Sequence, residues 1–260
     1  MIMQSSMSIP EGFSLKRTMA VSIFYGHVFK RQLLVYSLAS LFFFILLLMP
    51  FRAAAQLALF TMIFSIMPLL VQFSPVVLAK SGDFRTIEYM LPAKASEKLG
   101  VFLVYFLVII PITVYLLPEL SLILYRIFPA VQTEEGLDIV NIHFSNPPIF
   151  VITNILTLAS GTLTCLYVEI RCHHARVVKG ILSVFAVNIG ISLLGAFYGV
   201  KAAFTAGYNA AMEGKQGQAV VYDIMNTMAA ETGYALFIIG VLAVYCITLV
   251  CLIYRKIKNN

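Results

Sequence analysis

Long apolar runs alternate with short polar segments along most of the chain, and each run is about as long as a membrane-crossing helix. Six such runs occur, at 33–50, 53–79, 99–117, 148–170, 180–200 and 233–254. About 20 apolar residues carry a helix across the hydrocarbon core of a bilayer, and only helices and closed barrels satisfy the backbone there. The pattern predicts an all-α, polytopic membrane protein with six transmembrane helices in one domain, residues 1–260.

Prolines and short connections refine the expected shape of these helices. Pro68 and Pro75 fall inside the second run and are expected to bend it, because a proline cannot donate the helical hydrogen bond. Pro111 lies inside the third run, where neighbouring helices can satisfy the carbonyl that it frees. Only Phe51 and Arg52 separate the first two runs, so the sequence predicts a tight helical hairpin there.

The segment before the first run has a different pattern. Residues 1–12 are polar and lack the basic, apolar and small-residue regions of a signal peptide, so none is expected. Residues 13–31 place apolar residues on one side, with basic residues towards the ends or on the other side: Ala20, Ile23, Phe24 and Val28, against Lys16, Arg17, Lys30 and Arg31. This pattern predicts an N-terminal amphipathic interfacial helix whose basic side faces anionic headgroups.

Composition agrees with a membrane protein and limits what else the chain can be. Of the 260 residues, 60% are apolar and 12% are charged, and there is no Trp. A soluble domain of this length does not need so much apolar surface, and the six runs leave no room for a sizeable soluble domain. The net charge of +6 does not indicate nucleic-acid binding, because the basic residues follow the topology.

Lysine and arginine are distributed unevenly between the two sides of the predicted bundle. With the N-terminus in the cytosol, the cytosolic segments hold fourteen of the eighteen basic residues, and the outer segments hold Arg52, Arg126, Lys201 and Lys215. An excess of Lys and Arg marks the cytosolic loops of membrane proteins. The sequence therefore predicts that both termini and residues 81–100 are cytosolic.

One charged segment, residues 81–100, separates the second run from the third. Its apolar residues recur at the spacing of a short amphipathic helix: Phe84, Ile87 and Leu91. Pro92 cannot continue that helix, and Ser96 can cap the helix that enters the membrane next. The segment is therefore expected to form a short helix along the cytosolic membrane face, followed by a corner and re-entry into the bilayer.

The sequence around Pro92 resembles a segment of a known family. Residues 90–99 read Met-Leu-Pro-Ala-Lys-Ala-Ser-Glu-Lys-Leu, which is similar to the LPAS-x-x-EK segment after the second span in permeases of the type-2 ABC exporter class, notably in Bacteroidetes-like sequences. This chain departs from the pattern in having Lys94 and Ala95 before Ser96. The arrangement of the six runs extends the resemblance over most of the chain.

The resemblance implies a function and a set of partners. The chain would be the permease subunit of an exporter in the bacterial inner membrane, assembled with a separate P-loop ATPase and with a second permease subunit, as a homodimer or a heterodimer. The family has a connecting helix at 13–31 and re-entrant or external helices between the last two spans. Its coupling helix, which docks on the ATPase, would here use Phe84, Ile87, Glu88, Leu91, Pro92, Glu97 and Lys98.

Residue patterns for catalysis or metal binding are missing from the sequence. There is no G-x-x-x-x-G-K-[ST] phosphate loop, since Gly214 and Lys215 lack both the first glycine and the following Ser or Thr. His173 and His174 follow Cys172, but adjacent helical residues point about 100° apart and no second Cys/His pair is near. The four cysteines form no disulfide framework. We therefore expect no enzymatic activity, no cofactor and no metal.

Polar uncharged residues inside the apolar runs leave two interpretations open. The fourth run carries a polar set, of which all but the asparagine share one helical face: Thr153, Asn154, Thr157, Ser160 and Thr164. These residues either form hydrogen bonds between helices or line a weakly polar translocation surface. In the fifth run, Gly195 and Gly199 form a G-x-x-x-G motif, which predicts close helix packing within the chain or across a dimer.

Two alternatives to a permease stay open, a secondary transporter and a non-transporting membrane scaffold or assembly protein. No run carries an ionisable residue near its middle, which argues against a proton- or ion-coupled transporter. A scaffold would use the cytosolic segment to bind its partner. The substrate also stays open, as does the form of two outer segments. Residues 120–128 are either an interfacial or re-entrant helix or a continuation of the third span. Residues 202–232 are expected to form one or two short helices, interfacial or re-entrant.

The charge asymmetry predicts which residues an impermeant thiol reagent reaches from each side of the membrane. In a cysteine-free background, Ser81→Cys is expected to be labelled only from the cytosolic side and Gln216→Cys only from outside, because positive loops stay in the cytosol. The measurement is labelling of intact cells compared with inverted vesicles. Labelling of Ser81→Cys in intact cells would reverse the topology and remove the cytosolic docking helix.

Overall fold

Helices make up nearly all of the structure, a computed structural model that describes residues 14–49, 53–79, 93–127, 140–141, 148–172, 175–212 and 232–259. Their order is α1 (Leu15–Leu48), α2 (Ala53–Gln72), α3 (Ser74–Ala79), α5 (Ala95–Val104), the π-helix η1 (Tyr105–Ile109), α6 (Ile110–Ile127), α8 (Pro148–Arg171), α9 (Arg176–Met212) and α11 (Thr232–Asn259). The all-α fold predicted from the apolar runs is confirmed for these residues.

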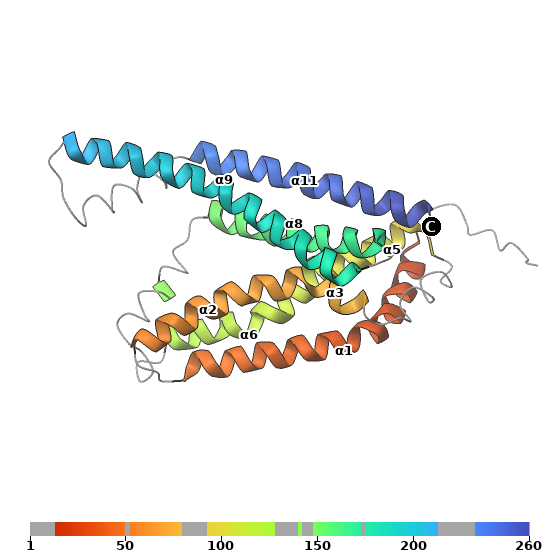
Figure 1. Ribbon diagram of the computed structural model, residues 1–260. Coiled ribbons are helices and arrows are strands. Elements are labelled where there is room, and N and C mark those ends of the chain that lie inside the picture. The colour runs from red at the N-terminus through yellow and green to blue at the C-terminus, as the bar shows by residue number, and fades with distance from the viewer. Residues whose placement is uncertain are drawn as a thin grey trace, which may run out of the picture.

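The long helices form two groups (Figure 1). In the α1 group, α1 and α2 pack against α6; in the α8 group, α9 and α11 pack against α8. The groups meet where α2 and α3 pack against α8 and where α5 packs against α11, and in Figure 1 they lie further apart towards the opposite end of the molecule. We call the end that holds the start of α1, the start of α5 and the end of α11 the basic end, because Lys and Arg residues cluster there.

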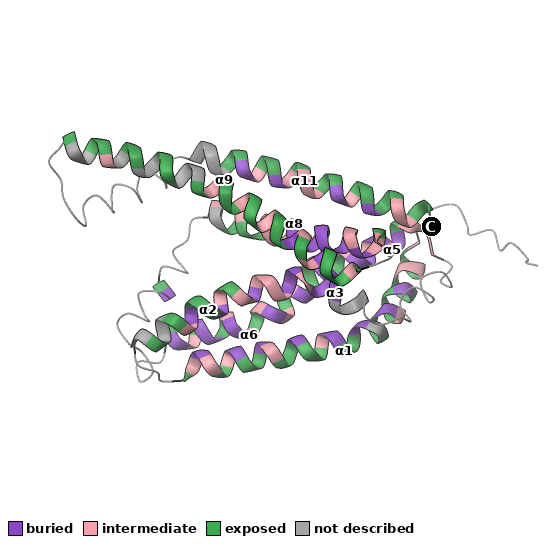
Figure 2. Ribbon diagram, viewed as in Figure 1, coloured by how far each residue is buried: buried purple, intermediate pink, exposed green. Residues whose placement is uncertain are grey.

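Five described helices are long and apolar enough to cross a membrane: Phe29–Leu48, Ala95–Ile127, Val151–Arg171, Arg176–Ala196 and Leu236–Asn259. Many of their large apolar side chains are exposed, and Figure 2 shows exposed residues all along α1, α9 and α11. Apolar faces of this extent match a hydrocarbon surrounding rather than water. The chain is therefore a helical, multi-pass membrane protein.

The predicted second span is divided in the structure. Its residues form α2 and the short α3, which are separated by a turn at Phe73, two residues before Pro75. Pro68 lies inside α2 without ending it. Only Ala58–Gln72 remains as an apolar helix, and it is shorter than the five spans. A sixth membrane crossing is therefore not confirmed, and the expected interruption occurs at Pro75.

The N-terminal region differs from the predicted interfacial helix. Residues 13–31 and the first apolar run belong to one continuous helix, α1, which begins at Leu15 and bends on its way to Leu48 (Figure 1). The expected apolar stripe is also displaced by one residue, because Val21, Tyr25 and Phe29 are buried while Ile23 is exposed. The buried face packs on α5 and η1, where Phe29 stacks on Tyr105 with ring centroids 3.6 Å apart.

The third span runs much further than predicted. Helix continues from Ala95 to Ile127 through α5, η1 and α6, so residues 120–127 continue the span and form no separate interfacial helix. The wide π turn comes just before Pro111, and the amide of Ile110 bonds to the Tyr105 carbonyl, five residues back. A π turn relieves the clash that a proline ring makes with the preceding turn of an α-helix.

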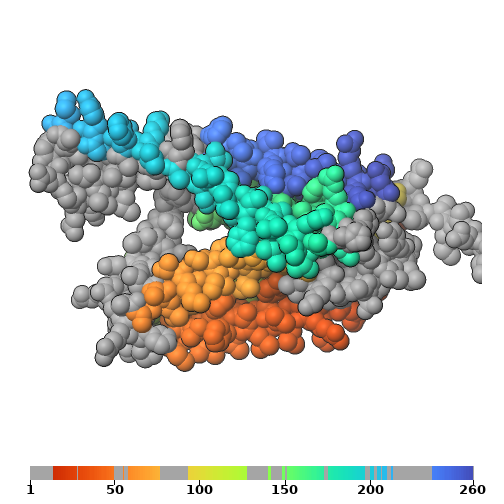
Figure 3. Space-filling model, viewed as in Figure 1, coloured from red at the N-terminus to blue at the C-terminus, as the bar shows by residue number. Residues whose placement is uncertain are grey.

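The fourth, fifth and sixth predicted spans each fall on one helix. α8 and α11 extend the predictions by a few residues, whereas α9 continues to Met212. Part of the 202–232 segment therefore prolongs the fifth helix, and residues 213–231 lie outside the described part of the chain. On the face shown in Figure 3, the first half of α9 lies against α2, which brings the two groups together beside the site described next.

Candidate functional site

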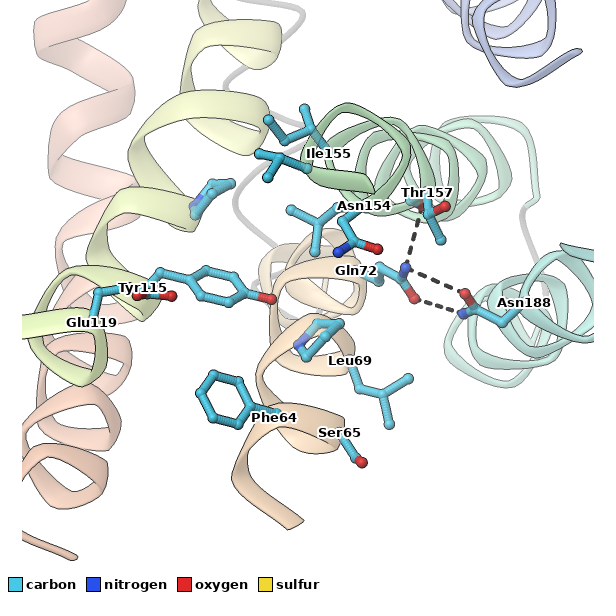
Figure 4. A pocket seen from close by; sticks show the side chains of 14 residues that line it. Phe64, Ser65, Leu69, Gln72, Tyr115, Glu119, Asn154, Ile155, Thr157 and Asn188 are labelled. Atoms are coloured by element: carbon cyan, nitrogen blue, oxygen red, sulfur yellow. Dashed lines mark hydrogen bonds between the residues drawn. The ribbon is translucent and has the colours of Figure 1, made fainter. Parts of the chain in front are cut away.

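A pocket of about 880 Å³ lies between α2, α6, α8 and α9. Pockets of roughly 300–1,000 Å³ are the size that holds a drug-sized molecule. Each helix contributes one face, with residues spaced mostly three or four apart: Phe64, Ser65, Pro68, Leu69 and Gln72 from α2; Pro111, Tyr115 and Glu119 from α6; Val151, Asn154, Ile155, Thr157 and Leu158 from α8; and Asn188 from α9. Figure 4 shows these side chains around the pocket.

A pair of carboxamides, Gln72 and Asn188, closes the pocket wall between α2 and α9 (Figure 4). The Asn188 amide donates to Gln72 Oε1 at 2.7 Å, and the Gln72 amide donates back to Asn188 Oδ1 at 3.4 Å. Gln72 also donates to the Thr157 carbonyl of α8 at 3.4 Å. This amide pair connects three helices, and Gln72 is only 1% exposed.

The position of Gln72 depends on a glycine in α8. A Cβ at residue 161 would lie 2.5 Å from the Cδ of Gln72 and 2.8 Å from its Nε2, which is closer than atoms of neighbouring side chains approach. Gly161 therefore provides the space in which the Gln72 side chain crosses α8. Any larger residue there would push the carboxamide away from Asn188 and Thr157.

Two other polar groups face the pocket. Asn154 of α8 and Tyr115 of α6 point into it from different walls (Figure 4), and neither side chain makes a hydrogen bond with the residues that the structure describes. Glu119 lies one turn beyond Tyr115 and is the one charged side chain among the described lining residues. The rest of the lining is mainly apolar.

The polar set predicted on the fourth run is divided between two roles. Asn154 and Thr157 line the pocket, as a translocation surface would require. The hydroxyls of the other three bond to main-chain carbonyls of the preceding helical turn: Thr153 to Ile149, Ser160 to Thr157 and Thr164 to Ser160. Thr164 also contacts the Tyr245 hydroxyl of α11 at 2.9 Å, which matches the expected bonding between helices.

Glu97 occupies a different environment from the one expected for a docking residue. Its carboxylate, 0% exposed, accepts hydrogen bonds from the amides of Ser14 and Lys94 at 3.0 and 3.1 Å. Arg17 donates to it through Nε at 3.1 Å and Nη2 at 3.0 Å. A buried carboxylate needs such partners, so Glu97 fastens α5 to α1 and offers no surface to another protein. This corrects the sequence-based assignment of Glu97.

Most of the other predicted docking residues lie in a part of the chain that the structure does not describe. Phe84, Ile87, Glu88, Leu91 and Pro92 lie outside the described residues, and Lys98 is half-buried at the start of α5. The N-cap of α5 is Lys94, two residues before the predicted cap Ser96. The Lys94 amide donates to the Glu97 carboxylate, and Ser96 is exposed inside the first turn.

Two further features bear on the predicted site residues: the packing at the glycine motif of α9 and the absence of a metal-binding cluster among the described residues. Within the described chain, no atom lies within 4 Å of the position that a Cβ of Gly195 would take, so Gly195 packs against no other helix there. The structure does not describe the surroundings of Gly199, so packing of this motif across a dimer stays a prediction. The described residues hold no cluster of three or more His, Cys, Asp or Glu side chains, and none of the four cysteines, all of which are described, is in a disulfide.

Gln72 and Asn188 lie inside the second and fifth apolar runs, and no sequence pattern joined them into a site. They are 116 residues apart, and only the fold brings them together. The useful signal was the residue type, because a carboxamide inside a membrane helix needs a partner.

The fold and the pocket define a multi-pass helical membrane protein with a pocket between its helices. No family model, no curated protein and no solved structure matches this chain. The resemblance of residues 90–99 to type-2 ABC exporter permeases therefore rests on the sequence of that segment and on the arrangement of the apolar runs.

The contact between Gly161 and Gln72 gives a prediction for stability. Gly161→Ala is expected to destabilise the fold by about 1–3 kcal/mol, the range for overpacking a filled site, because the carboxamide of Gln72 must leave its partners. The free energy of unfolding in mixed micelles measures this. In a Gln72→Ala background, where the clashing atoms are gone, Gly161→Ala should cost much less.

Gly190→Ala in α9 is the matched control for this prediction. Nothing lies within 4 Å of its Cβ position among the described residues, so the substitution is expected to be neutral or to stabilise the helix by up to about 1 kcal/mol. Equal effects of Gly161→Ala in both backgrounds would show that Gln72 is not the group displaced.

Proposed function

We propose that this chain is the membrane-spanning permease subunit of an ATP-driven exporter, and that the pocket holds the transported molecule. The observation that carries this proposal is the position of the pocket between the two helix groups, with walls from both. Relative movement of the groups would change the access to such a pocket, which is the basis of alternating access in transporters. The wall residues Asn154 and Thr157 supply weak polarity without a fixed charge.

The distribution of basic residues supports a cytosolic location for one end of the bundle. Described Lys and Arg residues gather at the basic end: Lys16, Arg17, Lys94, Lys98, Arg171, Arg176, Lys179, Arg255, Lys256 and Lys258. By the positive-inside rule this end faces the cytosol, in a bacterial inner membrane if the family resemblance holds. In this arrangement α2 and α3 together form the sixth crossing, and both termini are cytosolic.

The contacts at the basic end support a route by which an ATPase would act on the pocket. The proposed coupling segment, 81–92, leads directly into α5, and Glu97 fastens the first turn of α5 to α1. From there, continuous helix runs through η1 and α6 to Pro111, Tyr115 and Glu119 of the pocket wall. A push on the coupling segment would therefore reach the pocket through one stiff element. By family analogy, two permease subunits and two ATPase subunits make the working unit.

Docking on an ATPase is tested by substitution of Ile87, the centre of the predicted apolar face. Ile87→Asp is expected to reduce recovery of the candidate P-loop ATPase at least tenfold, because apolar anchors dominate the energy of such interfaces. Copurification at equal membrane abundance measures this. Ile87→Met keeps the apolar contact and is the matched control, and Lys98→Ala, a charge at the rim, should change little.

Two results would contradict the proposal. Recovery of the ATPase with Ile87→Asp at the wild-type level would mean that residues 81–92 are not the docking site. Recovery of no ATPase with the wild-type chain would remove the exporter assignment and favour a scaffold that binds another partner.

A further inference from the structure

Three carboxamides line the pocket beside four other polar residues, Ser65, Tyr115, Glu119 and Thr157. Gln72, Asn154 and Asn188 line it from α2, α8 and α9, among apolar side chains such as Phe64 and Leu158. Within the described lining there is no Lys, Arg or His, and the one charged residue is Glu119. A ligand for this pocket must therefore be largely apolar, with its polar part matched to amide groups.

Asn154 shows which groups the ligand must bring. It lies inside the span Val151–Arg171, is exposed to the pocket and bonds to no described residue. A carboxamide offers donors and an acceptor together, and a ligand that displaces water from the pocket leaves both without partners unless it supplies them. The complement to Asn154 therefore has to present a donor and an acceptor side by side.

The neighbouring wall already contains such a complement. Gln72 and Asn188 bond reciprocally, each carboxamide donating to the oxygen of the other. A ligand amide would form the same two-bond arrangement with Asn154, and the Tyr115 hydroxyl on the facing wall could donate to the same group. Esters offer only acceptors, so an ester would pair with the Asn154 N–H groups and leave the Asn154 carbonyl oxygen without a donor.

The charge of the lining selects against acidic ligands. A carboxylate in the pocket would find no Lys, Arg or His on the described walls to offset its charge, and an ionised group without a partner is costly inside a membrane protein. Fatty acids and other apolar anions are therefore disfavoured relative to uncharged molecules of the same length.

We propose that the pocket binds an uncharged, largely apolar molecule that carries a carboxamide or peptide group, of the acyl-amide or hydrophobic-peptide class, with its amide paired to Asn154. The claim that this molecule is transported rests on the proposed permease function. The claim that it binds in the pocket concerns the chain alone and is tested without an ATPase.

The probe is dodecanamide with a photoreactive diazirine in mid-chain, added to the purified chain in lipid nanodiscs. Labelling should saturate, fall on peptides of α2, α6 and α8 that line the pocket, and be removed by excess dodecanamide. Two matched competitors of the same length are compared: the methyl ester, which cannot donate, and the carboxylate at pH 9, where a carboxyl group is ionised. Each is expected to compete at least about tenfold less well, the effect of losing one well-formed hydrogen bond.

Three variants locate the selectivity. Asn154→Leu should weaken dodecanamide binding about tenfold, and Asn154→Ala, which removes the amide without added bulk, should do the same. Asn209→Leu makes the same change on α9 outside the pocket and should leave binding unchanged.

The inference is overturned if labelling does not saturate, if the three head groups compete equally, or if both Asn154 variants bind dodecanamide as the wild type does. The experiments distinguish failure of the amide-binding inference from failure of the permease proposal. Selective amide binding by a chain that recovers no ATPase would keep the inference and remove the exporter. ATPase recovery without amide selectivity would keep the exporter and leave this pocket without the proposed ligand.

Discussion

The arrangement of the two helix groups depends on one buried carboxamide. Gln72 leaves α2, crosses α8 over Gly161 and bonds to Asn188 of α9. A buried amide must find partners for both of its polar ends, so α2 can lie against the α8 group only where those partners are present. Beside this contact the walls separate and the pocket begins. The same interaction therefore both holds the groups together and limits the space between them.

A second buried polar group organises the basic end. The Glu97 carboxylate is surrounded by donors from the starts of α1 and α5. Removing one member of such a group leaves a charge without compensation, which is far more costly than the net contribution of the intact pair. The first turns of α1 and α5 therefore behave as one body. The aromatic stacking of Phe29 on Tyr105 continues that attachment along the same pair of helices.

Apolar periodicity predicted the helices well where an apolar run ended at clear polar residues, as at Pro148–Arg171 and Thr232–Asn259. It failed at Lys30, Arg31 and Gln32, which resemble a boundary. Basic side chains can extend along a helix to reach polar surroundings, and Gln32 is satisfied by the Ser74 carbonyl and the Tyr105 hydroxyl, contacts that no local pattern shows. Asn154 and Thr157 were visible as candidate site residues, whereas the meeting of Gln72 with Asn188 depends on the packing of distant segments.

Gly161, Gln72 and Asn188 restrict one another's replacement during evolution. A side chain at 161 is tolerated only with a shorter residue at 72, and a shorter residue at 72 removes the donor to Asn188 Oδ1, while the Asn188 N–H keeps its bond to the Val184 carbonyl. Single steps away from this trio pass through either a steric clash or an unsatisfied amide. These three positions, on three helices, are therefore expected to drift as a unit, while lipid-facing neighbours such as Leu193 can exchange one apolar side chain for another independently.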